Sequence, residues 1–419
     1  MSAPPQGLVR LMHLDLDQPI PALTGGSGTF VVVWFRGVPL GKLDLDSSQL
    51  PRTASQVAEL IAPAITAAVH GHLFAPEAEP NVAPVLHDLN ALRTVGDPLA
   101  RLADRLTLPD GSGDAVSVVV CAQDRAESLG RCLAGLAAQR HQPLEVIVVG
   151  GTPASDGMMA THPKVRHVLE RRPGWNSARN AGARASRGTV VAFIDDDAQP
   201  HPDWVGRVGA AFTDPSIAAL TGQVLPAALD TEEQVLFERW WTLGRDCTPR
   251  VYGPSFFAST RHRGAPVWEV GPAVNMAFRR DVLAGVGPFD QRFDYDATGR
   301  AGAGEMWYRL VAAGHRIRYE PAAVVHREHG GGRAELRKQI REFRSGHAAG
   351  LLMQWEKSGH SGNLLRLAVG VPAHSLGLAA QRAIGVRTPQ SSMLRDEVAG
   401  AVHGTLHYLQ SRLSGARCG

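Results

Sequence analysis

Three consecutive aspartates, Asp195, Asp196 and Asp197, directly follow an apolar run at residues 190–194. A short run of this kind is typical of a strand buried on both faces of a sheet. In open α/β sheets, ligands bind where the strands end at their carboxyl termini. Adjacent carboxylates repel one another, so a cation would compensate the cluster. The residues therefore predict a divalent-metal site. The alternative is a solvated acidic turn before a helix that begins at Pro202.

The composition narrows the class of protein. The chain has 419 residues, of which 44% are hydrophobic and 20% are charged, and its net charge is +3. This length predicts two or three globular domains, and the charge is too small to predict nucleic-acid binding. Four scattered cysteines, no signal-peptide pattern and no uninterrupted apolar run of membrane-spanning length indicate a cytoplasmic protein. The best candidate for a span, residues 364–384, is interrupted by arginines, a histidine and a proline.

Four regions are expected along the chain. Residues 1–75 predict a small α+β domain, with strands at 29–35 and 41–45 and a helix at 55–73. We expect residues 76–114 to form a linker that contains a helix at 92–106. Residues 115–330 predict the main domain, and residues 331–419 a helical extension. No chemistry is visible in the first region, which we interpret as a scaffolding or partner-contact domain.

The main domain alternates strands and helices. Strands are expected at 116–121, 144–149, 165–169, 190–194, 270–278 and 316–319, and helices at 176–186, 232–243 and 306–313. This alternation predicts an α/β fold with a doubly wound, mostly parallel sheet. Trp240 and Trp241 end one predicted helix and cannot both face its core. One could line a sugar or acceptor surface, while at least one packs against a neighbouring element.

The helical extension begins with a basic amphipathic segment at residues 333–350. Leu336, Ile340 and Phe343 fall on one side, and five basic residues lie elsewhere. Such a helix can lie on anionic lipid at the inner face of a membrane, or it can be a solvated surface helix. Residues 386–395 predict a loop, and residues 395–413 a further helix.

The main domain resembles glycosyltransferase family 2, the inverting nucleotide-sugar transferases of the GT-A fold. Five stretches occur in the family's order: SVVVCAQDRAESLGRCL at 117–133, RRPGWNSARNAG at 171–182, VVAFIDDDAQPHPDW at 190–204, VGPAVNMAFRRDVLAGVGPFD at 270–290 and MWYRLVAAGHRIRYEPAAVVHREH at 306–329. A single acidic motif is a weak signal, whereas the ordered set covers about half of the chain.

The resemblance implies roles for particular residues. Asp195 or Asp196 would face the ribose and the metal, Asp197 would ligate Mn²⁺ or Mg²⁺, and His329 would lie near the metal, with His326 as its rival. A general base must also accept the proton of the acceptor hydroxyl. The residues expected around the donor are Cys121, Ala122, Asp124, Arg125, Arg172 and Arg179.

Two departures from the family pattern concern the nucleotide and the base. The second strand ends in Gly150-Gly151 in place of an aspartate that contacts the nucleotide base, and Asp156 is an uncertain substitute. The acidic pair before the closing helix is missing. Glu305, in the first turn of that helix, is the candidate base, with Asp294 or Asp296 as alternatives; otherwise Glu305 is only a first-turn helix acid.

The expected activity is transfer of a sugar from a nucleotide-sugar donor, with a UDP-sugar as the first candidate, to a glycan, lipid-linked or small-molecule acceptor. Two alternatives stay open. A nucleotidyltransferase would be expected to have a glycine-rich phosphate loop after the first strand, where this chain has Ala122-Gln123-Asp124. A catalytically silent sugar-nucleotide-binding protein would keep the fold without the base. The sequence does not indicate the oligomeric state.

Overall fold

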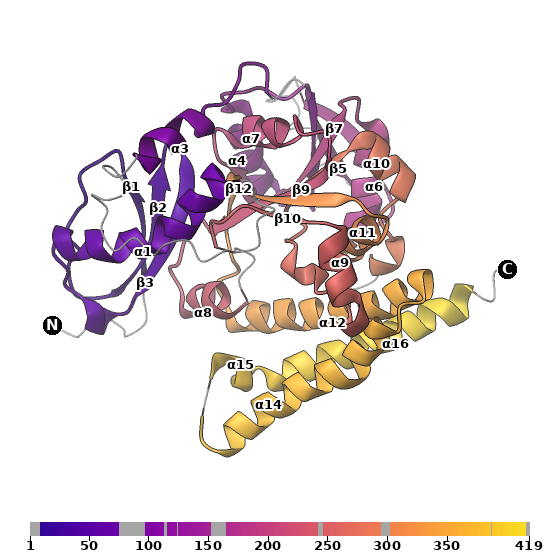
Figure 1. Ribbon diagram of the computed structural model, residues 1–419. Helices are drawn as coiled ribbons and strands as arrows, with labels where there is room; N and C mark the ends of the chain where they lie inside the picture. Colours follow the sequence, from indigo (N-terminus) through magenta and orange to yellow (C-terminus); the bar gives the residue numbers. More distant parts are fainter. Residues whose placement is uncertain are drawn as a thin grey trace.

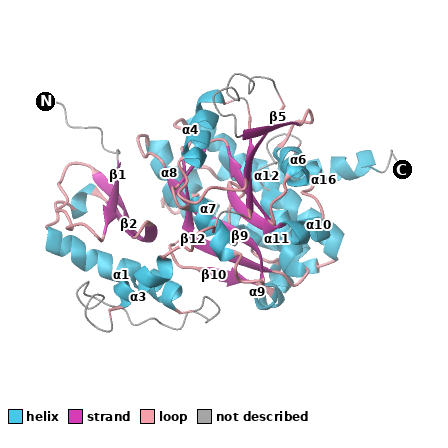
Figure 2. Cartoon of the chain, turned by 90° about the horizontal axis from the view of Figure 1, so that it is seen from above, coloured by secondary structure: helices cyan, strands magenta, loops and turns pink. Residues whose placement is uncertain are grey.

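The computed structural model describes residues 9–74, 97–112, 115–123, 125–151, 165–241, 246–294, 302–386 and 388–415. Two sheets and a group of C-terminal helices make up the described part. Figure 2 shows the small N-terminal sheet to one side of the large sheet, and Figure 1 shows the C-terminal helices along a different side.

The small sheet has the order β1-β2-β3. Its strands are β1 (Val9–Asp15), β2 (Gly28–Phe35) and β3 (Val38–Leu45), and α1 (Ala54–Leu73) packs against β3. Thr53 caps α1 by accepting a hydrogen bond from the Gln56 backbone N–H. The predicted strands and helix are confirmed. The sequence analysis missed β1, which pairs in parallel with β2. The short helix α3 (Pro98–Leu106) packs on α1.

The large sheet has nine strands in the order β10-β12-β9-β11-β7-β4-β5-β6, with β8 paired to β12. The pairings give β4, β5, β6, β7, β9 and β12 one direction and the other three strands the opposite direction. The α/β class with a mostly parallel sheet is therefore confirmed. The strands are β4 (Val116–Cys121), β5 (Glu145–Gly150), β6 (Val165–Leu169), β7 (Val190–Asp195), β8 (Ala198–Pro200), β9 (Ile217–Pro226), β10 (Arg250–Tyr252), β11 (Asn275–Arg279) and β12 (Arg316–Arg327).

Helices cover both faces of the large sheet because the side chains of each strand alternate between its faces. Val118 and Val120 pack in one core with residues of α4 (Ala126–Ala137) and α7 (Trp204–Ala211). Val119 packs in the opposite core with residues of α6 (Trp175–Ala185) and α11 (Gly302–Ala312). The other helices of this part are α8 (Glu232–Trp240), α9 (Pro254–Thr260) and α10 (Arg280–Val286).

Two strands differ from their predicted limits. The strand expected at 270–278 begins at Asn275, because Gly271 has a φ of +158° and Pro272 has no N–H to donate. The strand expected at 316–319 runs on to Arg327 as β12. Its pairing with β9 is interrupted by a register shift between Glu320 and Val324.

The C-terminal helices begin with α12 (Arg333–Ser358), which packs along α16 (Leu394–Gly415). Between them lie α13 (Ser361–Leu365), a π-helical turn (Arg366–Gly370), α14 (Val371–Ala383) and α15 (Pro389–Ser392). The sequence analysis missed α14 and placed α15 in a loop. Among the described helices, none is both long and apolar enough to cross a membrane.

Candidate active site

The aspartate cluster, Asp195 to Asp197, lies where β7 ends beside β4. All three side chains are largely buried, and Asp196 is fully inaccessible. The Gln123 backbone N–H donates a 2.7 Å hydrogen bond to Asp196 Oδ2. Burial raises the pKa of Asp196 to about 6, although this hydrogen bond and the nearby Arg125 oppose the shift.

Three arginines from separate parts of the chain compensate the cluster. Arg125 pairs with Asp196, and its Nη1 lies 2.8 Å from Asp197 Oδ2. Arg327, at the end of β12, lies 3.0 Å from the same oxygen. Arg179 Nη2 on α6 lies 3.8 Å from Asp195 Oδ1. Burial would raise the pKa of Asp197, but Arg327 and Arg125 outweigh it and lower that pKa to about 2.

The second oxygen of Asp197 is the feature that fits a cation. Oδ1 is buried and has no hydrogen-bond partner among the described residues. Within the same residues, no three His, Cys, Asp or Glu side chains surround one point as a metal-binding group. Mg²⁺ is commonly bound by one or two carboxylates together with substrate phosphates. The carboxylates present therefore fit an ion that a diphosphate helps to hold.

The two candidate histidines point to different places, His326 from within β12 and His329 from the segment that follows it. His329 lines a pocket with Asp195, its ring centroid lies 4.7 Å from that of Phe237, and its Nε2 lies 3.4 Å from Glu238 Oε2. His326 instead stacks on Trp34 of the small sheet, at 6.1 Å between ring centroids. Burial lowers the pKa of His326 to about 4. The structure brings His329, but not His326, to the aspartates.

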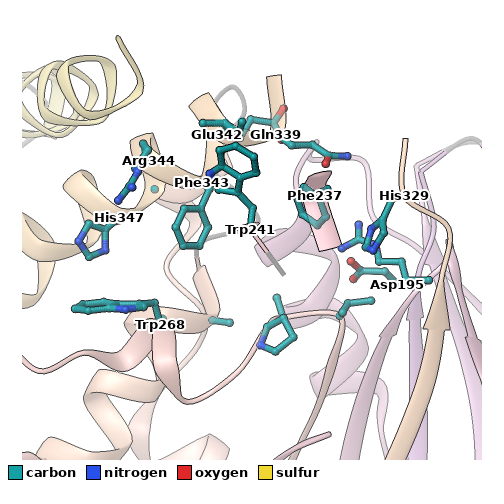
Figure 3. Close-up of a pocket in the computed structure, with 18 of the residues that line it drawn as sticks. Asp195, Phe237, Trp241, Trp268, His329, Gln339, Glu342, Phe343, Arg344 and His347 are labelled. Atoms are coloured by element: carbon teal, nitrogen blue, oxygen red, sulfur yellow. The ribbon is translucent and has the colours of Figure 1, made fainter. Parts of the chain in front are cut away.

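A pocket of about 900 Å³ opens from the aspartate cluster. Figure 3 shows His329 beside Asp195 at one end and Trp268 and His347 at the other, with Trp241 and Phe343 between them. Trp240 and Trp241, the two tryptophans that the sequence analysis considered for a sugar or acceptor surface, both line the pocket. Trp241 also packs against Leu336 and Ile340. The pocket therefore has an end formed by the aspartate cluster and an aromatic end, where Arg344 and Glu342 also line the wall.

Glu305 lines this pocket from the first turn of α11, with its side chain fully buried. Arg309 Nε lies 2.8 Å from Glu305 Oε1, and Lys357 Nζ lies 2.8 Å from the same oxygen. Asp294 is occupied elsewhere, because it accepts hydrogen bonds from the Asn176 and Ser177 backbone N–H groups, both at 2.7 Å, at the start of α6. Asp296 lies outside the described residues.

The residues expected around the donor are only partly brought together. Arg125 lines the pocket, whereas Arg172 is exposed and pairs with Glu170 at 2.9 Å. Cys121 is buried, and burial raises the pKa of its thiol to about 12. Its neighbour Ala122 uses its backbone N–H to bond Val149 O. Asp124 and Asp156 lie outside the described residues.

The sequence analysis missed Arg327 and Lys357. Arg327 stands between the two histidines of the quoted stretch HREH, and a basic residue in that stretch was a usable signal. Lys357 reaches Glu305 from α12, 52 residues further along the chain, and no local pattern indicates this contact.

Comparison with known proteins identifies the family. The model of "Glycosyl transferase family 2" matches residues 117–287. The chain is 32% identical over 197 residues to the "Glucosyl-dolichyl phosphate glucuronosyltransferase" of Haloferax volcanii, covering 45% of this chain and 58% of that protein. It is 28% identical over 254 residues to the "Pre-mycofactocin glycosyltransferase" of Mycobacterium tuberculosis, covering 57% and 48%. The chain thus spans about half the length of these relatives.

One relative is covered more completely, and solved structures are also similar. An uncharacterised glycosyltransferase of M. tuberculosis is 30% identical over 207 residues, which cover 49% of this chain and 83% of that protein. A mannosyltransferase of Pyrobaculum calidifontis, solved with GDP-Man and Mn²⁺, matches with 20% identity and a TM-score of 0.45, covering 71% and 89% of the two chains. The family model and the well-covered relative lead to one conclusion: this chain belongs to glycosyltransferase family 2.

Proposed function

We propose that the protein is an inverting, metal-dependent glycosyltransferase that moves a sugar from a nucleotide-sugar donor to an acceptor hydroxyl. The observation that carries this proposal is Asp197, whose buried Oδ1 has no partner among the described residues while Oδ2 meets two arginines that also line the pocket. The names of the relatives, all of them glycosyltransferases, support the same activity.

Asp197 would hold Mn²⁺ or Mg²⁺ together with the donor's diphosphate, and Asp195 and His329, which line the same pocket, would join it only after their side chains move, because the described residues form no group of three such ligands. When bound, the ion neutralises charge that develops on the leaving diphosphate. Arg125 and Arg327 contribute in the same place, since guanidinium groups pair well with phosphate oxygens. Both arginines are already oriented by Asp197, so they keep their positions before the donor arrives. A UDP-sugar is our first candidate for the donor.

We propose Glu305 as the general base, provided that Lys357, one of its two ion-pair partners, moves aside. Arg309 and Lys357 both occupy Glu305 Oε1, each at 2.8 Å, so an acceptor hydroxyl can reach this oxygen only where one of the two cations moves aside. Lys357 comes from α12, which also forms one wall of the pocket. Glu305 can therefore act as base when acceptor binding draws Lys357 away from Oε1.

The aromatic end of the pocket would receive the acceptor. Trp241, Trp268 and Phe343 offer flat apolar surfaces, which suit a ring or chain that carries the reacting hydroxyl. We propose an acceptor with an apolar body, which includes lipid-linked acceptors and apolar small molecules.

Donor turnover tests the proposal. The protein is incubated with a panel of nucleotide sugars, with Mn²⁺, with Mg²⁺ or with chelator, and release of the nucleoside diphosphate is measured. We expect release from one donor class in the presence of metal and its loss in chelator. Unchanged turnover in chelator would contradict the metal dependence. Donor binding without turnover would favour the silent binding protein. In a parallel assay with a nucleoside triphosphate and a sugar 1-phosphate, release of pyrophosphate would favour the nucleotidyltransferase.

A further inference from the structure

The C-terminal helices expose a large apolar surface that the glycosyltransferase reaction does not explain. On and beside α14, Leu376 is 68% exposed and Ile384 is 77% exposed, and Leu365 and Val369 in the preceding turns are also exposed. Leu378 is the only buried residue of α14. A helix this apolar and this exposed indicates a binding surface.

The neighbouring helix α16 continues this surface with a regular stripe. Its exposed residues Val398, Val402, Leu406, Leu409 and Leu413 recur every three or four positions and therefore share one face. The opposite face packs against α12: a side chain at Gly404 would meet Ser345 O at 2.0 Å, and one at Gly400 would meet Arg341 O at 2.5 Å. Figure 1 shows α14 and α16 side by side, beyond α12 and away from both sheets.

The charge around the surface is of one sign. Residues 359–395 and 398–419 contain no Asp or Glu, and Arg382 and Arg395 are exposed there. The two intervening acids are buried and bound to α12: Asp396 pairs with Arg337 at 2.9 Å, and Glu397 pairs with Arg344 at 2.8 Å. The surface therefore combines exposed apolar side chains with positive charge only.

These pairs also change the expectation for α12. From its basic residues, the sequence analysis left two interpretations for residues 333–350, a helix that lies on anionic lipid or a solvated surface helix. Arg337, Arg341 and Arg344 instead face the buried acids of α16. The arginines of α12 therefore hold the C-terminal helices together, and the surface available for lipid lies on α14 and α16.

We propose that α14 and the exposed face of α16 form a docking surface for an anionic lipid bilayer. The apolar side chains enter the boundary between head groups and acyl chains, and the arginines meet lipid phosphates. A second copy of this chain fits less well, since it would bring two positive surfaces together. The surface adjoins the pocket: Arg366, in the turn before α14, lies 3.9 Å over the ring of Trp268.

Vesicle binding tests this surface separately from the glycosyltransferase activity. The purified full chain is sedimented with vesicles of phosphatidylcholine alone or of phosphatidylcholine mixed with phosphatidylglycerol. We expect binding to the mixed vesicles only, weakened by salt. The triple variant Leu376→Gln, Val402→Gln, Leu406→Gln should bind at least about tenfold more weakly. A matched control, Phe74→Gln with Leu144→Gln, changes exposed apolar residues elsewhere and should bind like the parent.

A charge variant and an oligomer measurement complete the test. Arg382→Glu with Arg395→Glu keeps the apolar residues and should also lose binding to the mixed vesicles, so the proposal can be judged even where the triple variant fails to fold. Absence of binding by the parent, or undiminished binding by both variants, would overturn the proposal. A dimer in light scattering that the variants dissociate, without lipid binding by the parent, would assign the surface to a second copy instead.

Discussion

Arg327 and Asp197 form a buried ion pair that joins the end of β12 to the turn after β7, with 3.0 Å between Arg327 Nη2 and Asp197 Oδ2. Both side chains are only 8% exposed. Arg125 Nη1 lies 2.8 Å from the same oxygen. One carboxylate oxygen thus serves two cations, which leaves the other oxygen for a third.

The first prediction concerns that third cation. Asp197→Asn keeps the size of the side chain but removes its charge, so Mn²⁺ affinity in the presence of a nucleoside diphosphate should fall by about tenfold or more. Isothermal titration calorimetry measures this affinity. Asp104→Asn, on the exposed side of α3, is the matched control. Equal Mn²⁺ affinity in the Asp197→Asn variant and the parent would remove Asp197 from the metal site.

The second prediction concerns stability. Arg327→Met leaves a buried carboxylate with one cation fewer, and breaking such a pair typically costs about 3–5 kcal/mol. We expect a loss of about 3 kcal/mol in the free energy of unfolding, measured by urea denaturation at neutral pH. Arg327→Lys retains the positive charge without the planar guanidinium group, so its free energy of unfolding should fall by less than that of the Met variant. A Met variant as stable as the parent would show that Arg125 alone compensates Asp197.

The third prediction concerns the base. Glu305→Gln should lower turnover by about tenfold or more while donor affinity changes little, because the amide cannot accept the proton. Single-turnover kinetics with separate donor titration distinguish the two quantities. Asp294→Asn should act differently, because Asp294 accepts hydrogen bonds at the start of α6. We expect this variant to lose thermal stability, with a smaller change in the turnover of each folded molecule. Full turnover in the Gln variant would make Glu305 a structural partner of Arg309 and Lys357.

The fourth prediction is a pH dependence of stability. Burial lowers the pKa of His326 to about 4, and burial also lowers the pKa values of its neighbours His13 and His201. Below about pH 6.5 the unfolded chain binds protons that the folded chain does not, so stability should fall as the pH falls from about 6.5 towards 4. Trp34, which stacks on His201 and His326, supplies a fluorescence signal for unfolding.

A matched variant checks the source of this dependence. His326→Gln should flatten the decline in stability between about pH 6.5 and 4, since one buried group that titrates is removed. His72 has a pKa lowered to about 4 by burial and lies in another environment, so part of the decline should persist. An unchanged pH profile in the His326→Gln variant would contradict the assignment to the interface with the small sheet.

The fifth prediction concerns the nucleotide base. Gly150, at the end of β5, has no side chain that could accept a hydrogen bond from the uracil N–H. We therefore expect the protein to distinguish uridine nucleotides only weakly from other nucleotides. A side chain fits there, because the nearest atom to an added Cβ is Ala122 Cβ at 3.6 Å. Gly150→Asp should therefore strengthen the preference for UDP in a competition assay. Tight, exclusive UDP binding by the parent would contradict the prediction.

The aspartate cluster could be located from the sequence because its signal is local: an apolar run followed at once by charges. Its partners could not, since Arg327 reaches Asp197 from 130 residues away. The choice between His326 and His329 needed the strand to be placed, because His326 lies within β12 whereas His329 follows the end of the strand at Arg327. Helix α14 was missed because Gly370, Pro372 and Gly377 weaken the pattern and one buried leucine gives no periodicity.

Strand β12 carries the last consequence. Val324 and His326 face the aromatic residues of the small sheet, whereas Val325 lies in the core on the other side and Arg327 reaches Asp197. At the end of the register shift, just before Val324, the Asn275 side chain donates hydrogen bonds to Gln223 O and Ala323 O and so fixes the phase of the strand.

Because the side chains of a strand alternate, one inserted residue after Ala323 would exchange the two sides and turn Arg327 away from Asp197. An insertion of two residues would preserve the alternation. This strand therefore tolerates insertions or deletions only of an even number of residues. Only such changes keep both its contacts with the small sheet and the pairing of Arg327 with Asp197 in the active site.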